Sequence, residues 1–434
     1  MKIKSLAILL GLSVCFTVFG EQTETTPNDP YFAGFYLPKA PKPKGTVLRA
    51  GDQLAICGDS ITEQKMYSRI IETYLTVAVP ELHIGTRQFG WSGEQASGFL
   101  QRMTNDVLRF HPTVATTCYG MNDHHYRPYE PAIGQAYASN MTDIVLAFES
   151  ASTRVVIGSP GCMGFTKAPW GNFFQGTPED RNLNLCMLRD IDIQIAQVEH
   201  TGFADVFWDM FQAQYFARKW YGTNFGLAGK DSVHPGWAGH LVMAYAFLKG
   251  LDVPGDIGTF TVDLGAKKAA VSQGHQLLSF QDGAVTIKSG RYPFCATGQA
   301  DKDDSIRAGM TLVPFNAELN RLMLIVKGGK ANNYQVTWGD TSRSYSAQQL
   351  AQGVNLAADF EVNPFSNAFA AVDLAVAKKQ DYETIQVKNL FHGDEGKANM
   401  EKTVADSEVV RQTLADAIAG AFVPVTHTIV ITAQ

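Results

Sequence analysis

From residue 52 to about residue 250, short apolar runs alternate with longer stretches whose apolar residues recur at helical spacing. The apolar runs predict five β-strands, at 53–57, 83–89, 113–118, 154–158 and 204–208. The stretches between and after them predict helices near 63–78, 97–109, 131–149, 180–200 and 236–249. This alternation favours parallel strands joined by right-handed crossovers, with helices on both faces of the sheet.

The pattern changes after Gly250. Short runs of alternating apolar and polar residues predict further strands, at 258–264, 276–279, 284–288, 321–327 and 333–338. Residues 364–420 then become helical, and four apolar residues there repeat at helix spacing: Phe365, Phe369, Val372 and Val376. A final strand is predicted at 424–432. We therefore expect an α/β domain over 52–250 and a β-rich region over 251–434 with a helical segment at 364–420.

The first twenty residues have the pattern of a secretory signal peptide. Lys2 and Lys4 begin an apolar run over 5–19, and Gly20 is small enough to precede a cleavage site. The run is shorter than the ~20 apolar residues of a membrane span. An uncleaved anchor or a lipidated cysteine is the alternative. We expect cleavage after Gly20, a secreted or periplasmic protein, and an extended Pro-rich segment over 21–51.

Composition narrows the class of protein. The chain has 434 residues, of which 45 % are hydrophobic, and a formal net charge of −6. This is enough apolar material for a large core, and the acidic balance gives no basic surface for nucleic acid. The sequence contains no C-x-x-C pair, so it does not indicate a zinc ribbon. Because export permits disulfides, the pair to test is Cys162 with Cys186.

Four short segments carry chemically useful side chains, at 58–63, 90–93, 120–123 and 231–235. The first three lie near the ends of predicted strands, and the fourth precedes the helix predicted at 236–249. In the first, Ser60 would begin a helix, where its N–H is unpaired and the helix dipole favours an oxyanion. In the last, Asp231 stands three residues before His234. Its carboxylate can accept from Nδ1, which leaves Nε2 facing outward as a base.

The two middle segments supply hydrogen-bond donors. Gly93 can offer its backbone N–H, and Asn122 can offer its side-chain amide. Taken singly, each of the four segments has an ordinary interpretation as a helix cap or a turn. The loops at the carboxyl ends of parallel strands share one crevice, however. Together the segments therefore predict the nucleophile, base, orienting acid and oxyanion donors of an acyl-transfer enzyme.

In this order the segments resemble the SGNH subgroup of the GDSL hydrolases. The match covers 52–250 and rests on Gly58-Asp59-Ser60, Gly93, Gly120-Met121-Asn122-Asp123 and Asp231-Ser232-Val233-His234-Pro235. The resemblance implies a flavodoxin-like three-layer α/β/α sandwich. It implies Ser60 as nucleophile, His234 as base and Asp231 as its orienter. It also implies an oxyanion hole made by the Ser60 and Gly93 N–H groups and the Asn122 side chain.

One departure from the family is Gln88, where many members carry a structural Asn. The resemblance calls for no cofactor, and His124 and His125 lack the spacing of metal ligands with a carboxylate. Loop residues that could contact a substrate are Trp91, His124, Tyr126 and Trp170.

We therefore expect an exported serine esterase that removes a short acyl group, acetyl above all, from a small-molecule or glycan ester. The predicted helix after the nucleophile offers no apolar lipid channel, because it carries Glu63, Lys65, Arg69 and Glu72. A lipase, lysophospholipase or thioesterase of the same family is the alternative within the class. A catalytically idle carbohydrate-binding protein is the alternative from another class.

Overall fold

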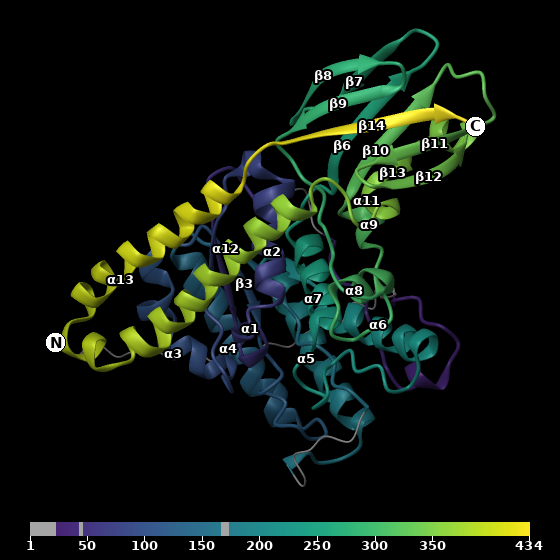
Figure 1. Cartoon of the computed structure of the whole chain (residues 1–434). Coiled ribbons are helices and arrows are strands. Elements are labelled where there is room, and N and C mark those ends of the chain that lie inside the picture. Colours follow the sequence, from purple (N-terminus) through teal and green to yellow (C-terminus); the bar gives the residue numbers. More distant parts are fainter. Residues whose placement is uncertain (1–22, 43–46, 166–172) are drawn as a thin grey trace, which may run out of the picture. The chain divides into compact units, whose positions relative to one another are not determined.

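The computed structural model describes residues 23–42, 47–165 and 173–434 (Figure 1). Residues up to Lys39 and residues 40–434 form two separate units. In the described part of the first unit, Thr23 pairs with Pro38 in a short bridge. The expected signal peptide, its cleavage after Gly20, and Trp170 lie outside the described residues.

A five-stranded parallel sheet lies at the centre of the 40–434 unit. Its strands are β1 (Gln53–Gly58), β2 (Gly85–Gln88), β3 (Val114–Cys118), β4 (Arg154–Gly158) and β5 (Gly202–Ala204). Their order is β2-β1-β3-β4-β5, and every pair is parallel. This is the doubly wound order of flavodoxin-like folds. The expected α/β fold is confirmed.

Helices cover the sheet in two layers. One layer contains α2 (Tyr67–Ala78), α6 (Val206–Tyr221) and α7 (Trp237–Gly250). The other contains α3 (Ala96–Asp106), α4 (Pro131–Ser150) and α5 (Pro178–Val198). Since both faces are covered, all of β3 and nearly all of β1 are buried, which explains their continuous apolar runs.

Three local expectations for this domain are wrong. The strand predicted at 204–208 ends at Ala204, because the Asp205 side chain accepts from the Trp208 N–H and caps α6. The helix predicted at 63–78 is divided into α1 (Ser60–Glu63) and α2, with Lys65 between them at φ 56°. Cys162 is a buried free thiol, so the disulfide considered with Cys186 is not formed.

The β-rich region consists of two sheets. The first contains β6 (Asp256–Asp263), β7 (Lys268–Val271), β10 (Arg321–Lys327) and β13 (Val354–Asn355). The second contains β8 (His275–Gln281), β9 (Ala284–Ser289), β11 (Asn333–Trp338), β12 (Thr341–Ser346) and β14 (Val425–Ala433). Phe260 of the first sheet packs against His275 and His427 of the second, with ring centroids 5.0 and 5.8 Å away. The sheets thus share one core. The expected β-rich region is confirmed, although β7, β12 and β13 were not predicted.

Short helices connect these strands: α8 (Ile306–Leu312), α9 (Phe315–Glu318), α10 (Ala347–Gln352) and α11 (Leu356–Asp359). After α11 the chain leaves the two sheets, forms α12 (Ser366–Ile385), a π-helical turn (Gln386–Phe391) and α13 (Asp394–Ala421), and returns as β14. We call residues 366–421 the C-terminal hairpin, because α12 and α13 pack side by side (Figure 1).

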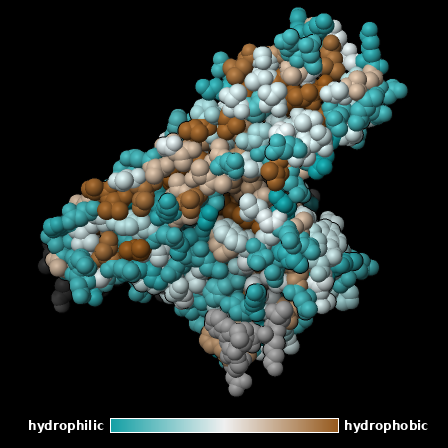
Figure 2. All heavy atoms as spheres, viewed as in Figure 1, coloured by the Kyte–Doolittle hydropathy of each residue, from teal (hydrophilic) through white to brown (hydrophobic). Residues whose placement is uncertain are grey.

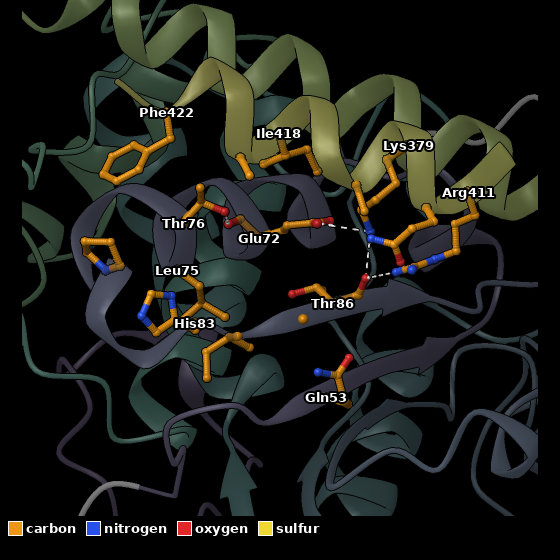
Figure 3. Close-up of a pocket in the computed structure, with 16 residues that line it drawn as sticks. Gln53, Glu72, Leu75, Thr76, His83, Thr86, Lys379, Arg411, Ile418 and Phe422 are labelled. Atoms are coloured by element: carbon orange, nitrogen blue, oxygen red, sulfur yellow. Dashed lines mark hydrogen bonds and ion pairs between the residues drawn. The ribbon is translucent and has the colours of Figure 1, made fainter. Parts of the chain in front are cut away.

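The C-terminal hairpin covers the edge of the parallel sheet. Helix α12 packs against α2 and β2. The Lys379 ammonium and the Arg411 guanidinium both donate to the backbone oxygen of Thr86 on β2, at 2.6 and 2.8 Å (Figure 3). An exposed strand edge is thereby closed. As expected, the C-terminal region belongs to the same compact unit as the sheet.

Apolar side chains also lie on the exposed face of the hairpin, over α12 and α13 (Figure 2). The largest of them are Leu374, Ile385, Val409 and Val410. Within the part of the chain that the structure describes, no helix has both the length and the apolar character needed to cross a membrane.

Candidate active site

Ser60 lies at a tight junction between β1 and α1. A side chain at Gly58, the last residue of β1, would collide with Thr62. Asp59 caps α1, since its Oδ1 accepts from the Ile61 N–H at 2.9 Å. Ser60 is therefore the first residue of the helix, where its N–H has no intrahelical partner. Glycine and a capping aspartate thus place the serine at the carboxyl end of a buried strand.

Ser60, His234 and Asp231 form one chain of hydrogen bonds. The Ser60 Oγ lies 2.9 Å from His234 Nε2, and His234 Nδ1 lies 2.7 Å from Asp231 Oδ2. The other carboxylate oxygen accepts from the N–H groups of Val233 and His234, at 2.9 and 2.8 Å. Because the carboxylate favours a proton on Nδ1, Nε2 faces the serine as an acceptor. The structure brings these three side chains together as the sequence predicted.

Asp231 and His234 each shift the pKa of the other toward the charged form. The hydrogen bond that His234 donates to Asp231 raises the pKa of His234 above its usual value, while burial opposes that rise. Burial would raise the pKa of Asp231, but the hydrogen bonds from His234 and from the loop backbone hold it below its usual value. A proton taken up by His234 is therefore stabilised by a carboxylate that stays ionised.

A buried polar bridge, not predicted from the sequence, links the base loop to the nucleophile helix. The Tyr67 N–H donates to His240 Nδ1 at 3.3 Å, so Nε2 carries the proton and donates to Gln64 Oε1 at 3.1 Å. The Gln64 amide then donates to the Pro235 backbone oxygen at 3.3 Å. Burial lowers the pKa of His240 to about 3 and keeps this histidine neutral. The bridge fixes the distance between the helix of Ser60 and the loop of His234.

Gly93 lies in a turn packed against the junction between β1 and α1. The Glu94 N–H donates to the Trp91 oxygen at 3.2 Å, and the Trp91 N–H donates to the Gly58 oxygen at 3.0 Å. Gly93 has φ 75°, which favours glycine, and no atom lies within 4 Å of where its side chain would be. Among the described residues, neither the Gly93 N–H nor the Ser60 N–H donates a hydrogen bond. Both backbone donors are available to a ligand.

The Asn122 amide lies between Asp59, which precedes α1, and the turn that contains Gly93. Its Nδ2 donates to the Glu94 oxygen at 3.0 Å and to Asp59 Oδ2 at 3.3 Å, and its Oδ1 accepts from the Tyr126 hydroxyl at 2.8 Å. Burial raises the pKa of Asp59 to about 7. Both amide hydrogens of Asn122 are thus donated within the protein, and the bond to Asp59 is the longer of the two.

The side chains expected to contact a substrate are placed differently from the prediction. His124 is wholly buried, its Nδ1–H donates to the Met121 oxygen, and burial lowers its pKa to about 3. Its expected substrate contact is therefore wrong. Tyr126 is only 8 % exposed and orients Asn122. Trp91 is half-buried, and its ring lies 4.9 Å from that of His392 on the C-terminal hairpin.

Two hollows adjoin the site. A hollow of about 320 Å³ against His234 is lined in part by Lys230, Asp231, Asp303 and Asp304. A second, of about 240 Å³ beside the turn of Asn122, is lined in part by Gln95, His125, Arg127 and Asn140. In the described ranges, no group of three His, Cys, Asp or Glu side chains is arranged to hold a metal ion.

Comparisons with known proteins bear on the family and the fold. The model of the GDSL-like lipase/acylhydrolase family matches residues 56–242. No curated protein matches the chain.

Among solved structures, a gut microbial diltiazem-metabolizing enzyme is 21 % identical, covers 91 % of this chain and 100 % of its own, and has a TM-score of 0.72. The two proteins thus share a fold over most of their length. An acetylxylan esterase from Geobacillus stearothermophilus is 21 % identical, covers 47 % of this chain and 95 % of its own, and has a TM-score of 0.39. An α/β hydrolase from the metagenome of Lake Arreo is 19 % identical, with coverages of 48 % and 98 % and a TM-score of 0.38. By the family match, the chain contains a GDSL-like lipase/acylhydrolase domain over residues 56–242, and the protein is a carboxylic-ester hydrolase.

Proposed function

We propose that the protein is an exported serine esterase that removes short acyl groups, acetyl above all, from carbohydrate alcohols. The observation that carries this proposal is the hydrogen-bond chain from Ser60 through His234 to Asp231. The pattern of the first twenty residues supports export.

In the proposed mechanism, Ser60 Oγ attacks the ester carbonyl while His234 Nε2 takes the hydroxyl proton. The imidazolium that forms is stabilised by the Asp231 carboxylate. As the tetrahedral intermediate collapses, His234 returns the proton to the leaving alkoxide. Water, deprotonated by the same nitrogen, then attacks the acyl-enzyme and releases the acid and free Ser60. An ester suits this sequence better than an amide, because an alkoxide leaves more readily than an amine.

The negative oxygen of the intermediate needs donors that are already in place. The unpaired N–H groups of Ser60 and Gly93 lie on two backbone segments that the Trp91–Gly58 hydrogen bond joins. The Asn122 amide lies between the same segments and is the proposed third donor.

The substrate class is inferred from what lines the site. Both adjoining hollows are bordered by carboxylates and cationic side chains, and the second also by amides; such groups suit hydroxyl-rich molecules better than a long acyl chain. Glu63, directly on the nucleophile helix, is ion-paired rather than part of an apolar channel.

Three measurements test the proposal. A fluorophosphonate probe should label the protein at Ser60, and an idle carbohydrate-binding protein would not label. With p-nitrophenyl esters of increasing chain length, kcat/KM should be highest for acetate and fall steeply beyond butyrate. Acetylated sugars should be deacetylated. A maximum at C8 or longer would favour a lipase instead.

A further inference from the structure

The C-terminal hairpin contacts the nucleophile helix through a lysine. The Lys388 ammonium, in the π-helical turn, lies 2.8 and 3.0 Å from the two carboxylate oxygens of Glu63, a residue 325 positions earlier. Glu63 ends α1, the short helix that Ser60 begins. π-Helical turns are rare and frequently mark functional sites. Here the turn presents a lysine to the nucleophile helix.

Glu63 in turn holds the residue before Gly93. Its Oε2 accepts from both the N–H and the Oγ of Ser92, each at 2.5 Å. Two bonds from one residue to one carboxylate oxygen fix the orientation of Ser92. The Gly93 N–H belongs to the next peptide plane, so the direction in which it points depends on how Ser92 is held.

The carboxylate remains an acceptor because it stays charged. Burial alone would raise the pKa of Glu63, but the hydrogen bonds from Lys388 and Ser92 lower it. Without Lys388 the carboxylate would lose its cation while remaining partly buried, and its hold on Ser92 would weaken.

The same turn is braced on its other side. The Trp91 ring lies 5.1 Å from the Lys388 ammonium, 4.9 Å from the His392 ring and 5.1 Å from the Arg102 guanidinium. His392 Nε2 also lies 2.8 Å from Asp106 Oδ2. The tryptophan that opens the Gly93 turn is therefore packed between the hairpin and α3.

The hairpin can brace this turn because it is itself held in place. Away from the site, Lys379 pairs with Glu72 at 3.0 Å (Figure 3). It also pairs with Glu383 at 2.7 Å, and these three side chains are almost fully buried. A cavity of about 540 Å³ lies beside this network, and the charges at its edge are paired within the protein. Buried, fully paired charges of this kind fix one arrangement of the elements that carry them.

We propose that Lys388 is a positioning residue for the esterase reaction: acting through Glu63 and Ser92, it aims the Gly93 N–H at the oxyanion. This inference rests on the proposed function of Ser60 and Gly93. It gives the C-terminal hairpin a role in catalysis as a fixed brace of the oxyanion turn.

The test is Lys388→Met in the full chain. The ion pair is partly buried, with side-chain exposures of 25 % and 18 %, and it is one surface-proximal pair among many contacts of the hairpin. We therefore expect a folded protein with only a small fall in melting temperature. With p-nitrophenyl acetate, kcat should fall about 10-fold, because small misplacements of a transition-state contact are costly, while KM stays unchanged. Affinity for a boronic acid, which forms a tetrahedral adduct with serine, should fall by the same factor.

Two variants serve as controls. Lys402→Met removes a lysine of the same hairpin whose ion pair with Asp406 is local and exposed, and it should keep wild-type kinetics. Lys388→Arg should restore most of the lost kcat, since an arginine can still pair with Glu63.

A double-mutant cycle separates positioning from general stabilisation. After Glu63→Gln, the further change Lys388→Met should cost little, because the path is already broken. If Lys388→Met fails to fold, Ser92→Ala at the exposed turn carries the test, and it should lower kcat without changing KM. A wild-type kcat in either folded variant would overturn the inference. Full activity in Ser60→Ala would instead overturn the proposed function.

Discussion

The Tyr126 hydroxyl donates to Oδ1 of Asn122 at 2.8 Å, and this bond decides which way the Asn122 amide faces. With the oxygen occupied, the amide nitrogen must turn toward Asp59 and the Gly93 turn. Tyr126 itself is held in a left-handed conformation, with φ 55°. A non-glycine residue seldom adopts this conformation, and it is typical of functional sites.

The amide orientation gives a graded prediction. Asn122→Ala should lower kcat about 10²–10³-fold, the usual loss for an oxyanion donor. Tyr126→Phe should lower kcat by a smaller factor, because the amide stays but its orientation is no longer imposed. Steady-state kinetics with p-nitrophenyl acetate measure both variants. Asn122→Ala with more than half of the wild-type kcat would remove this residue from the mechanism.

Ser60→Ala should abolish turnover and leave the fold intact. The substitution removes only a hydroxyl from the first residue of α1, and the Asp59 cap of that helix remains. Losing the nucleophile of such a triad costs several orders of magnitude in kcat. Circular dichroism should be unchanged while ester hydrolysis falls to the background rate. Residual activity within 100-fold of wild type would mean that another group attacks the ester.

Activity should fall on the acid side with an apparent pKa above 6.5. Asp231 raises the pKa of His234, and the protonated imidazole cannot accept the Ser60 proton. Activity is therefore present above this pKa and is lost as the pH falls through it. A profile of kcat/KM against pH measures this loss of activity on the acid side.

Asp59 provides the control for this profile, because burial raises its pKa to about 7, into the same range. In Asp59→Asn the helix cap can remain, and the acid limb should persist if His234 causes it. A profile that is flat from pH 5 to 9 in the wild-type protein would contradict the role of His234 as base.

Much of this architecture follows from local sequence patterns. Buried strands covered on both faces appear as apolar runs, and the residues after β1 and β3 were correctly placed at one edge of the sheet. The strand predicted at 204–208 failed for a local reason as well, since Val206 and Phe207 suit a buried helix as well as a strand.

Other features depend on contacts that no local pattern contains. Lys388 and Glu63 lie 325 residues apart, so neither residue indicates its partner. Gln88 illustrates the same limit. Its oxygen accepts from the Gly90 N–H at 3.0 Å, and its amide donates to Thr384 of the hairpin at 2.7 Å. The departure from the family Asn thus serves a contact with a region outside the family domain.

The hairpin should be necessary for stability as well as for the site. Lys379→Met would leave Glu72 and Glu383 buried without their shared cation, and removing one partner of a buried pair typically costs about 3–5 kcal/mol. Urea unfolding should show a lower midpoint than for Lys402→Met, whose ion pair is exposed. Equal midpoints would show that the buried network does not hold the hairpin.

The two-sheet core contains a chain of hydrogen bonds that requires two neutral histidines. Trp338 Nε1–H donates to His427 Nδ1 at 3.0 Å, so His427 Nε2–H donates to Ser289 Oγ at 2.9 Å. The Ser289 hydroxyl then donates to His275 Nδ1 at 2.7 Å, and His275 Nε2–H donates to the Ile257 oxygen at 3.0 Å. Each donor meets one acceptor, and a further proton on either ring would disrupt the chain.

This chain predicts a loss of stability in acid. Burial lowers the pKa of His427 to about 3, whereas the unfolded chain has the usual value of ~6.5. As the pH falls below ~6.5, His427 binds a proton in the unfolded state but not in the folded state. Stability therefore declines until the pH reaches the pKa of His427 in the folded protein. The expected decline for one such histidine is about 1.4 kcal/mol per pH unit.

Urea unfolding at pH 7, 6 and 5 measures this dependence. His427→Gln offers similar hydrogen bonds without titrating, so its free energy of unfolding should fall less steeply between pH 6 and 5 than that of the wild-type protein. His200→Gln, at an exposed histidine, should keep the wild-type slope. The same slope in His427→Gln as in the wild-type protein would show that this buried chain does not govern the acid limit, and His124 and His240, whose pKa burial also lowers to about 3, would then account for it.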